Sequence, residues 1–230
     1  MMSEVIEDRA SKEYFLSRFF CNWYRENGRS FPWREEGVGA YGILVAEFML
    51  RKTQAEKVCK YWQDFTANFP TPYDCVELDE ETLIERIRPL GLATIKAKAW
   101  KEICRIIVES HNGKIPESID MLERLPHIGT YTARAIYCFA FNKRVPLVDG
   151  NVIRVLSRIL GDNSKRDNRR VPAIWTLAER ILPVENFKEH NYGILDFSAQ
   201  ICTSRSPKCS DCDIKIACAT RIAAQLTNDV

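Results

Sequence analysis

The spacing of apolar residues is the feature that most constrains the fold of this chain. Nearly every long segment repeats its hydrophobic residues every three to four positions, and few segments alternate with a period of two. In "KEYFLSRFFCNWYREN", Phe15, Phe19 and Trp23 fall on one helical face, and Gly28 follows the segment. Similar segments recur between breaks rich in proline and glycine. The sequence therefore predicts an all-α protein with about ten helices.

Length and composition restrict the class of protein further. The 230 residues suit one large domain or two small ones with a hydrophobic core. No apolar run is long enough to span a bilayer, and the acidic N-terminal segment "MMSEVIEDRA" differs from a secretory signal. We therefore expect an intracellular protein without a membrane partner, in the cytoplasm or nucleoid if the source is prokaryotic. The net charge of +2 neither indicates nor excludes nucleic acid as a partner.

The nine cysteines form two groups. Five are scattered through apolar segments and are expected to be small buried hydrophobes: Cys21, Cys59, Cys75, Cys104 and Cys138. Four lie close together in a C-x6-C-x2-C-x5-C pattern: Cys202, Cys209, Cys212 and Cys218. In an intracellular chain this pattern indicates a metal site rather than disulfides. Four thiolates can hold zinc or a four-iron cluster, and the close spacing of the ligands favours the iron–sulfur cluster.

The segment "LERLPHIGTYTARAIYCFAF" at 122–141 predicts two helices joined by a tight turn that contains Gly129. Backbone N–H groups at the start of the second helix, together with the helix dipole, can hold a DNA phosphate without reading sequence. Ordinary helix–helix connections also contain glycine. Taken alone, the segment therefore favours a plain packing turn over a phosphate site.

Two carboxylates stand out from their surroundings. Asp149, in "PLVDGNVIRV", follows an apolar stretch and precedes a predicted helix. It fits an N-cap, and it also fits a carboxylate that stabilises positive charge on a reacting sugar or activates water. Glu47 lies in the apolar segment "GILVAEFML", where a buried carboxylate is costly unless it is paired or functional. Both residues are therefore candidates for catalysis.

These motifs occur in a specific order. The hairpin "LPHIGTYTARA", the segment "VDGNVIRV" and the cysteine pattern together resemble the helix–hairpin–helix DNA glycosylases related to endonuclease III, from about residue 31 to Cys218. The resemblance implies two helical domains that flank a DNA-binding groove. A six-helix barrel with the hairpin would span residues 40–145, and a helical domain with a [4Fe-4S] cluster would comprise residues 1–39 and 146–230. We expect a monomer that binds double-stranded DNA and flips out a mismatched or damaged base.

Tyr131 discriminates among the branches of this family. The bifunctional pyrimidine enzymes carry lysine at this position and the adenine glycosylases carry serine, whereas a tyrosine cannot form a Schiff base. The adenine enzymes also have a C-terminal domain, and this chain stops twelve residues after Cys218. The resemblance therefore favours a monofunctional glycosylase that removes thymine or uracil opposite guanine. Its alternatives are an adenine glycosylase acting on A/G or A/8-oxoguanine mispairs and a non-catalytic iron–sulfur DNA-binding protein.

The resemblance also implies a role for each candidate residue. Asp149 would support the oxocarbenium-like sugar or direct water at C1′, and Glu47 would hydrogen-bond or protonate the flipped base. Tyr131 would shape the pocket around the flipped nucleotide. Lys52 and Leu92 match residues that wedge into the gap left by that nucleotide. Lys52 also fits an ordinary phosphate contact, and Leu92 a core leucine.

The hairpin departs from the family pattern at one position. Gly129 and Thr130 match residues that contact the DNA backbone, but His127 stands where the family usually has its first glycine. A histidine is costly at positive φ and fills space where a phosphate would approach. We therefore expect His127 to weaken the usual backbone contact and to bind DNA itself.

Overall fold

The computed structural model describes residues 8–161 and 171–228, and all regular structure in these ranges is helical. The all-α prediction is thus confirmed. The helices described in these ranges are α1 (Arg9–Asn27), η1 (Pro32–Arg34), α2 (Ala40–Leu50), α3 (Ala55–Asn68), α4 (Pro72–Glu77), α5 (Glu80–Ile87), η2 (Arg88–Leu90), α6 (Ala93–His111), α7 (Ile119–Glu123), α8 (Thr130–Phe139), α9 (Gly150–Leu160), α10 (Val171–Ile181), α11 (Phe187–Gln200), η4 (Lys215–Ala217) and α12 (Ala219–Asn228).

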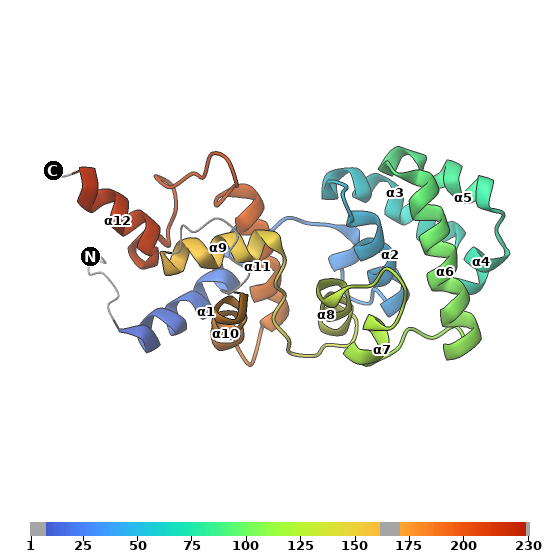
Figure 1. Cartoon of the computed structure of the whole chain (residues 1–230), viewed down its shortest axis with the longest axis horizontal. Coiled ribbons are helices and arrows are strands. Elements are labelled where there is room, and N and C mark those ends of the chain that lie inside the picture. The colour runs from blue at the N-terminus through green and yellow to red at the C-terminus, as the bar shows by residue number, and fades with distance from the viewer. Residues whose placement is uncertain (1–7, 162–170, 229–230) are drawn as a thin grey trace. The chain divides into compact units, whose positions relative to one another are not determined.

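The chain divides into two compact units, one comprising residues 1–29 and 144–230 and the other residues 30–143 (Figure 1). We call them the terminal unit and the middle unit. Residues 30–39, which we expected in the domain built from the chain ends, belong to the middle unit because η1 packs against α2 and α3. Among the described residues, no helix combines the length and the apolar character needed to cross a membrane.

In the terminal unit, α1 packs along α11, and both contribute to one hydrophobic core with α9 and α10. Gly193 allows the two helices to approach closely, because a Cβ atom there would lie 2.1 Å from the Phe20 carbonyl oxygen. Asp196 is fully buried and accepts hydrogen bonds from the Arg29 backbone N–H (2.8 Å) and Nε (2.9 Å). This pair fixes the end of α1 against α11.

In the middle unit, α6 packs against α4 and α5, and α2 packs against α3 and α8. Trp100 of α6 is almost fully buried, and its ring centroid lies 4.7 Å from that of Phe48 on α2. Residues 43–49 of α2 are all buried, so this helix presents apolar surface in every direction. The middle unit is therefore built around α2 and α6, and Glu47 is a carboxylate within that core.

The scattered cysteines mostly follow the expectation. Four of them are buried and Cys59 is only half-buried. Cys59 lies beside the buried stripe of α3, which is formed by Val58, Trp62 and Phe65, so it reaches the edge of the core rather than its interior. The prediction of burial was wrong for this residue, because it is one position along the helix from buried Val58 and therefore lies at the border of the apolar stripe.

Candidate DNA-binding and catalytic residues

Glu47 and Tyr131 lie on two helices that pack against each other. Glu47 stands near the C-terminal end of α2 and is only 8% exposed. Tyr131 is in the first turn of α8 and is half-buried. Since α2 packs against α8, the middle unit holds a buried carboxylate and a phenol on adjacent helices.

The hairpin connects α7 to α8 through a turn that contains His127 in the left-handed region, with φ of 62°. His127 therefore adopts a left-handed backbone conformation that favours glycine, at a conformational cost. Buried Leu125 and Ile128 anchor the turn on both sides of it. The His127 side chain is turned toward α6, where its Nε2 atom lies 3.1 Å from Glu102 Oε2.

The start of α8 remains open to a ligand. Gly129 is the N-cap residue, with extended backbone, and no side-chain hydrogen bond caps the helix there. A Cβ atom on Gly129 would meet nothing within 4 Å, and both Gly129 and Thr130 are exposed. The space beside Gly129 is therefore open despite the histidine two residues earlier. The helix N-terminus has the geometry of an anion site.

Lys52 and Leu92 occupy two exposed turns with unusual backbone conformation. Arg51 (φ −61°, ψ 112°) and Lys52 (φ 59°) have the dihedral angles of a type II turn, in which glycine is favoured at the second central position. Leu92 is the N-cap residue of α6, with φ of 54° and ψ of 35°. Its side chain is 57% exposed, which excludes the alternative of a core leucine.

Lys96 joins these two turns and was missed by the sequence reasoning. Its Nζ contacts oxygen atoms of both the segment after α2 and the segment before α6. A signal was present in the sequence, because Lys96 precedes Trp100, Ile103 and Ile107 at helical spacing and therefore lies on the buried face of α6.

Asp149 is in the terminal unit, where it is the N-cap residue of α9. Its Oδ1 atom accepts hydrogen bonds from the backbone N–H groups of Asn151 (2.9 Å) and Val152 (2.8 Å). Its Oδ2 atom accepts a further bond from Asn151 Nδ2 at 2.9 Å. The capping role is therefore present in the structure. The three bonds also hold the carboxylate in one orientation while it stays half-buried.

Asn151 and Arg154 extend this arrangement toward the cysteines. Arg154 Nη1 donates to Asn151 Oδ1 at 2.8 Å. The same guanidinium donates from Nε to the Cys202 carbonyl oxygen (3.1 Å) and from Nη2 to the Ser198 carbonyl oxygen (3.0 Å). A continuous chain of hydrogen bonds thus connects Asp149 to Cys202. The sequence reasoning missed both intermediate residues, whose spacing of three along a helix was the available signal.

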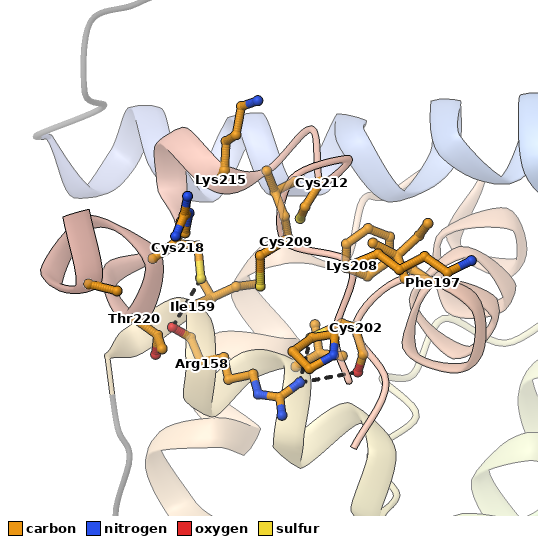
Figure 2. Close-up of a pocket in the computed structure, with 16 residues that line it drawn as sticks. Arg158, Ile159, Phe197, Cys202, Lys208, Cys209, Cys212, Lys215, Cys218 and Thr220 are labelled. Carbon is orange, nitrogen blue, oxygen red and sulfur yellow. Dashed lines mark hydrogen bonds between the residues drawn. The ribbon is translucent and has the colours of Figure 1, made fainter. Parts of the chain in front are cut away.

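The four C-terminal cysteines line one cavity of about 150 Å³ in the terminal unit (Figure 2). Its lining is largely apolar and includes Val155, Ile159 and Phe197. Arg158 contacts two of the cysteines, donating from Nη1 to Cys202 Sγ at 3.3 Å and accepting at its carbonyl oxygen from Cys218 Sγ at 3.4 Å (Figure 2). Within the two described ranges, no three His, Cys, Asp or Glu side chains form a ready-made site for a metal ion.

The thiols influence one another electrostatically. Burial raises the pKa of the Cys212 thiol to about 12, and the neighbouring charges of Cys202, Cys218 and Cys209 act in the same direction. Four thiolates are therefore unfavourable together in this apolar cavity unless positive charge joins them, as metal ions would supply. A water molecule needs roughly 10–15 Å³ by the same measure, so the cavity has room for a group larger than one water molecule. The donor set and the space both fit a [4Fe-4S] cluster.

Comparison with known proteins identifies the family. A model described as "HhH-GPD superfamily base excision DNA repair protein" matches residues 45–179. This chain belongs to that family. Among relatives of the HhH-GPD chain, a thymine-DNA glycosylase of Aeropyrum pernix is 38% identical over 88% of this chain and 92% of the relative. A thymine/uracil-DNA glycosylase of Methanothermobacter thermautotrophicus is 32% identical over 90% of this chain and 93% of the relative.

An adenine DNA glycosylase of Mycobacterium tuberculosis is also similar, with 36% identity over 90% of this chain and 68% of the relative. Among solved structures, a thermostable thymine-DNA glycosylase matches this HhH-GPD chain with a TM-score of 0.87 and 30% identity, covering 93% of this chain and 98% of the other. Endonuclease III in a complex with DNA matches with a TM-score of 0.80 at 20% identity, over 95% and 99% of the two chains. The latter match establishes the fold alone.

Proposed function

We propose that this chain is a monofunctional DNA glycosylase of base excision repair that removes thymine or uracil mispaired with guanine. The observation that carries the proposal is the similarity, over nearly the whole chain, to relatives named thymine- and thymine/uracil-DNA glycosylases. The resemblance at Tyr131, where the lyase branch has lysine, supports the same branch. The hydrolysed bond is the N-glycosidic bond, and the products are a free base and an abasic site.

The chemistry requires stabilisation of positive charge on the sugar and of negative charge on the departing base. Asp149, held by three hydrogen bonds, supplies a fixed carboxylate that opposes the developing oxocarbenium charge or directs water at C1′. Glu47, a carboxyl group in a buried setting, hydrogen-bonds or protonates the flipped base. Tyr131 bounds the pocket and provides no amine, so the strand stays intact after base release.

The DNA is held through backbone contacts and through wedging side chains. The N-terminus of α8, with exposed Gly129 and Thr130, binds a phosphate through backbone N–H groups. His127 contacts DNA at the same turn. Lys52 and Leu92 are exposed and fill the gap left when the target nucleotide leaves the stack.

The [4Fe-4S] cluster would be held by the four cysteines of the cavity. When bound, it would supply bonds to four thiolates within residues 202–218 and so hold this segment together over a cavity that α9 and α11 also line. The residues that line the cavity with the cysteines include Ile159 of α9 and Phe197 of α11, which support this structural role. Arg158 and Arg154 position Cys202 through their contacts with its sulfur and carbonyl oxygen.

Adenine excision is the second candidate, favoured by the 36% identity to the mycobacterial adenine glycosylase over 90% of this chain. The deciding experiment is a panel of duplexes, each with one test base, assayed for abasic product under single turnover. We expect product from thymine and uracil opposite guanine. Product only from adenine opposite guanine or 8-oxoguanine would establish the second candidate. A full panel without product would contradict glycosylase activity.

A further inference from the structure

Lys96 is a buried cation with an unusual set of partners. Its side chain belongs to α6 and the residue is only 7% exposed. The Nζ atom donates to the Met49 carbonyl oxygen at 3.2 Å, to Thr53 Oγ1 at 2.7 Å and to the Leu90 carbonyl oxygen at 3.4 Å. An ammonium group has three N–H donors, and these three acceptors use all of them.

Thr53 and Leu90 belong to two separate turns, and Met49 lies in the last turn of α2. Residues 50–53 form the Lys52 turn at the C-terminal end of α2, and residues 88–92 form the Leu92 turn, directly before α6. A second bond joins the same turns, because the Thr53 hydroxyl donates to the Leu90 carbonyl oxygen at 2.8 Å. Lys96, Thr53 and Leu90 therefore form one connected network between the two turns.

Such a cation has a cost that an apolar residue would avoid. Burial lowers the pKa of Lys96 to about 8, and the positive charges of Arg51 and Lys57 act in the same direction. Its hydrogen-bond partners are two carbonyl oxygens and a hydroxyl, which compensate burial less well than a carboxylate does. A methionine would fill the same space without this cost. The cost indicates a role other than general packing.

The Lys52 turn and the Leu92 turn, which this network connects, each contain a residue with strained backbone. Lys52 has φ of 59° and Leu92 has φ of 54°, and neither residue is glycine. A left-handed conformation is unfavourable for a residue other than glycine, and it persists only where neighbouring structure enforces it. Both side chains are exposed, so the strain does not serve burial. The left-handed backbone instead directs the Lys52 and Leu92 side chains into solvent, from two turns that the Lys96 network connects.

We propose that Lys96 is a positioning residue for base flipping: it fixes the Lys52 turn and the Leu92 turn as one rigid element, so that both wedging side chains enter the duplex together. This inference rests on the proposed function. If both turns are already fixed in the free protein, DNA binding does not have to bear the entropy cost of ordering two separate loops. Loss of Lys96 therefore slows the flipping step, while the bond-breaking groups Asp149 and Glu47 are unchanged.

The first experiment tests, in the free protein, whether Lys96 holds the Lys52 turn and the Leu92 turn in place. Amide hydrogen exchange is compared for wild type, Lys96→Met and Lys98→Met, since Lys98 is exposed on the same helix and loses the same charge. The amides of Thr53 and Gly91, which donate to Leu50 and Arg88 carbonyl oxygens, should exchange at least about tenfold faster only in Lys96→Met. Equal exchange in Lys96→Met and wild type would overturn the proposal.

The second experiment measures flipping with 2-aminopurine beside a thymine opposite guanine. Lys96→Met should lower the stopped-flow flipping rate at least about tenfold at an undiminished Tm, and Lys96→Arg should restore much of the rate because it keeps charge and donors. Thr53→Val should also slow flipping, and it provides the test if Lys96→Met folds poorly. The double variant that combines Lys96→Met with Leu92→Ala should flip the base at nearly the same rate as the slower of the two single variants.

Additive effects in that double variant, or unchanged flipping in an active Lys96→Met protein, would overturn the positioning role. A wild-type protein that neither flips nor excises any base of the panel would instead overturn the proposed function, and with it the role in DNA. The exchange experiment is independent of that outcome, because it reports on the two turns without DNA.

Discussion

At the scale of single residues, Asp149 caps α9, and one substitution separates this role from the catalytic role that we propose for its carboxylate. Asp149→Asn keeps an acceptor oxygen for the amides of Asn151 and Val152, so the cap of α9 and the Tm should be retained. It removes the negative charge, and the single-turnover rate of base release should fall roughly a hundredfold or more at unchanged DNA affinity. Asp79→Asn is the matched control, because Asp79 caps α5 at 2.8 Å. Unchanged base release in Asp149→Asn would show that the carboxylate only caps.

The proposed role of Tyr131 predicts the reaction product. The wild-type protein should release a free base and leave a strand that breaks only after alkali or heat, and borohydride should trap no covalent adduct, because no amine occupies the position of the lyase lysine. Tyr131→Lys should gain a trappable adduct, whereas Tyr131→Phe keeps the aromatic ring and should keep the wild-type product. Gels run with and without alkali and borohydride measure both results. A strong adduct with wild-type protein would refute the monofunctional assignment.

The sequence identifies the two candidate carboxylates but does not identify long-range side-chain contacts. Asp149 and Glu47 could be selected because each breaks a local pattern, one at a helix start and one inside an apolar run. The role of Lys96 depends on oxygen atoms that are up to 47 residues away, and that of Arg154 on a carbonyl 48 residues away. Local periodicity marks such a residue as buried or helical, but it does not identify the partner.

At the scale of elements, the contact between α1 and α11 contains a titratable group. His190 is 2% exposed and its Nδ1 lies 3.1 Å from the Ser17 carbonyl oxygen. Burial lowers its pKa from 6.5 to about 4. Between these pH values the unfolded chain binds a proton that the folded chain excludes, so stability falls as pH falls through this window. The contribution is at most about 3 kcal/mol, because one pKa unit corresponds to about 1.4 kcal/mol.

His190→Gln should therefore show a smaller loss of unfolding free energy between pH 7 and about pH 4.5 than wild type does. The measurement is urea denaturation at both pH values, with His111→Gln at the end of α6 as the control for the loss of a histidine. An equal loss in wild type and His190→Gln would show that other groups cause the acid sensitivity.

Helix boundaries with local signals were predicted well, and short elements were not. Asp149 is the N-cap of α9 as expected, and Gly28 follows α1 as expected. The helices α4 and α7 have six and five residues, which is too short for a repeating apolar pattern. The left-handed residues Lys52 and Leu92 carried no local signal, because glycine usually marks such positions.

At the scale of the whole molecule, the terminal unit joins segments from the two ends of the chain. Contacts such as that between Arg29 and Asp196 close this unit across 167 residues. Periodicity cannot reveal such a pairing, since each helix needs only some apolar partner. The resemblance supplied this arrangement because it covers nearly the whole chain. The structure divides the chain after residue 29, whereas we expected the division after residue 39, and η1 packs against α2 and α3 of the middle unit.

The cysteine cavity predicts the iron content and the thermal stability of the purified protein. Protein purified anaerobically should be yellow-brown with about four iron atoms per chain. Cys212→Ser should lose iron and lower the Tm, because Cys212 lines a cavity shared with Ile159 and Phe197 of the core. Cys59→Ser is the control, since that half-buried thiol lies outside the cavity and should leave the iron content unchanged. Metal analysis and thermal melting measure both effects. Stoichiometric zinc without iron would contradict the cluster, and an iron-replete Cys212→Ser protein would exclude this cysteine as a ligand.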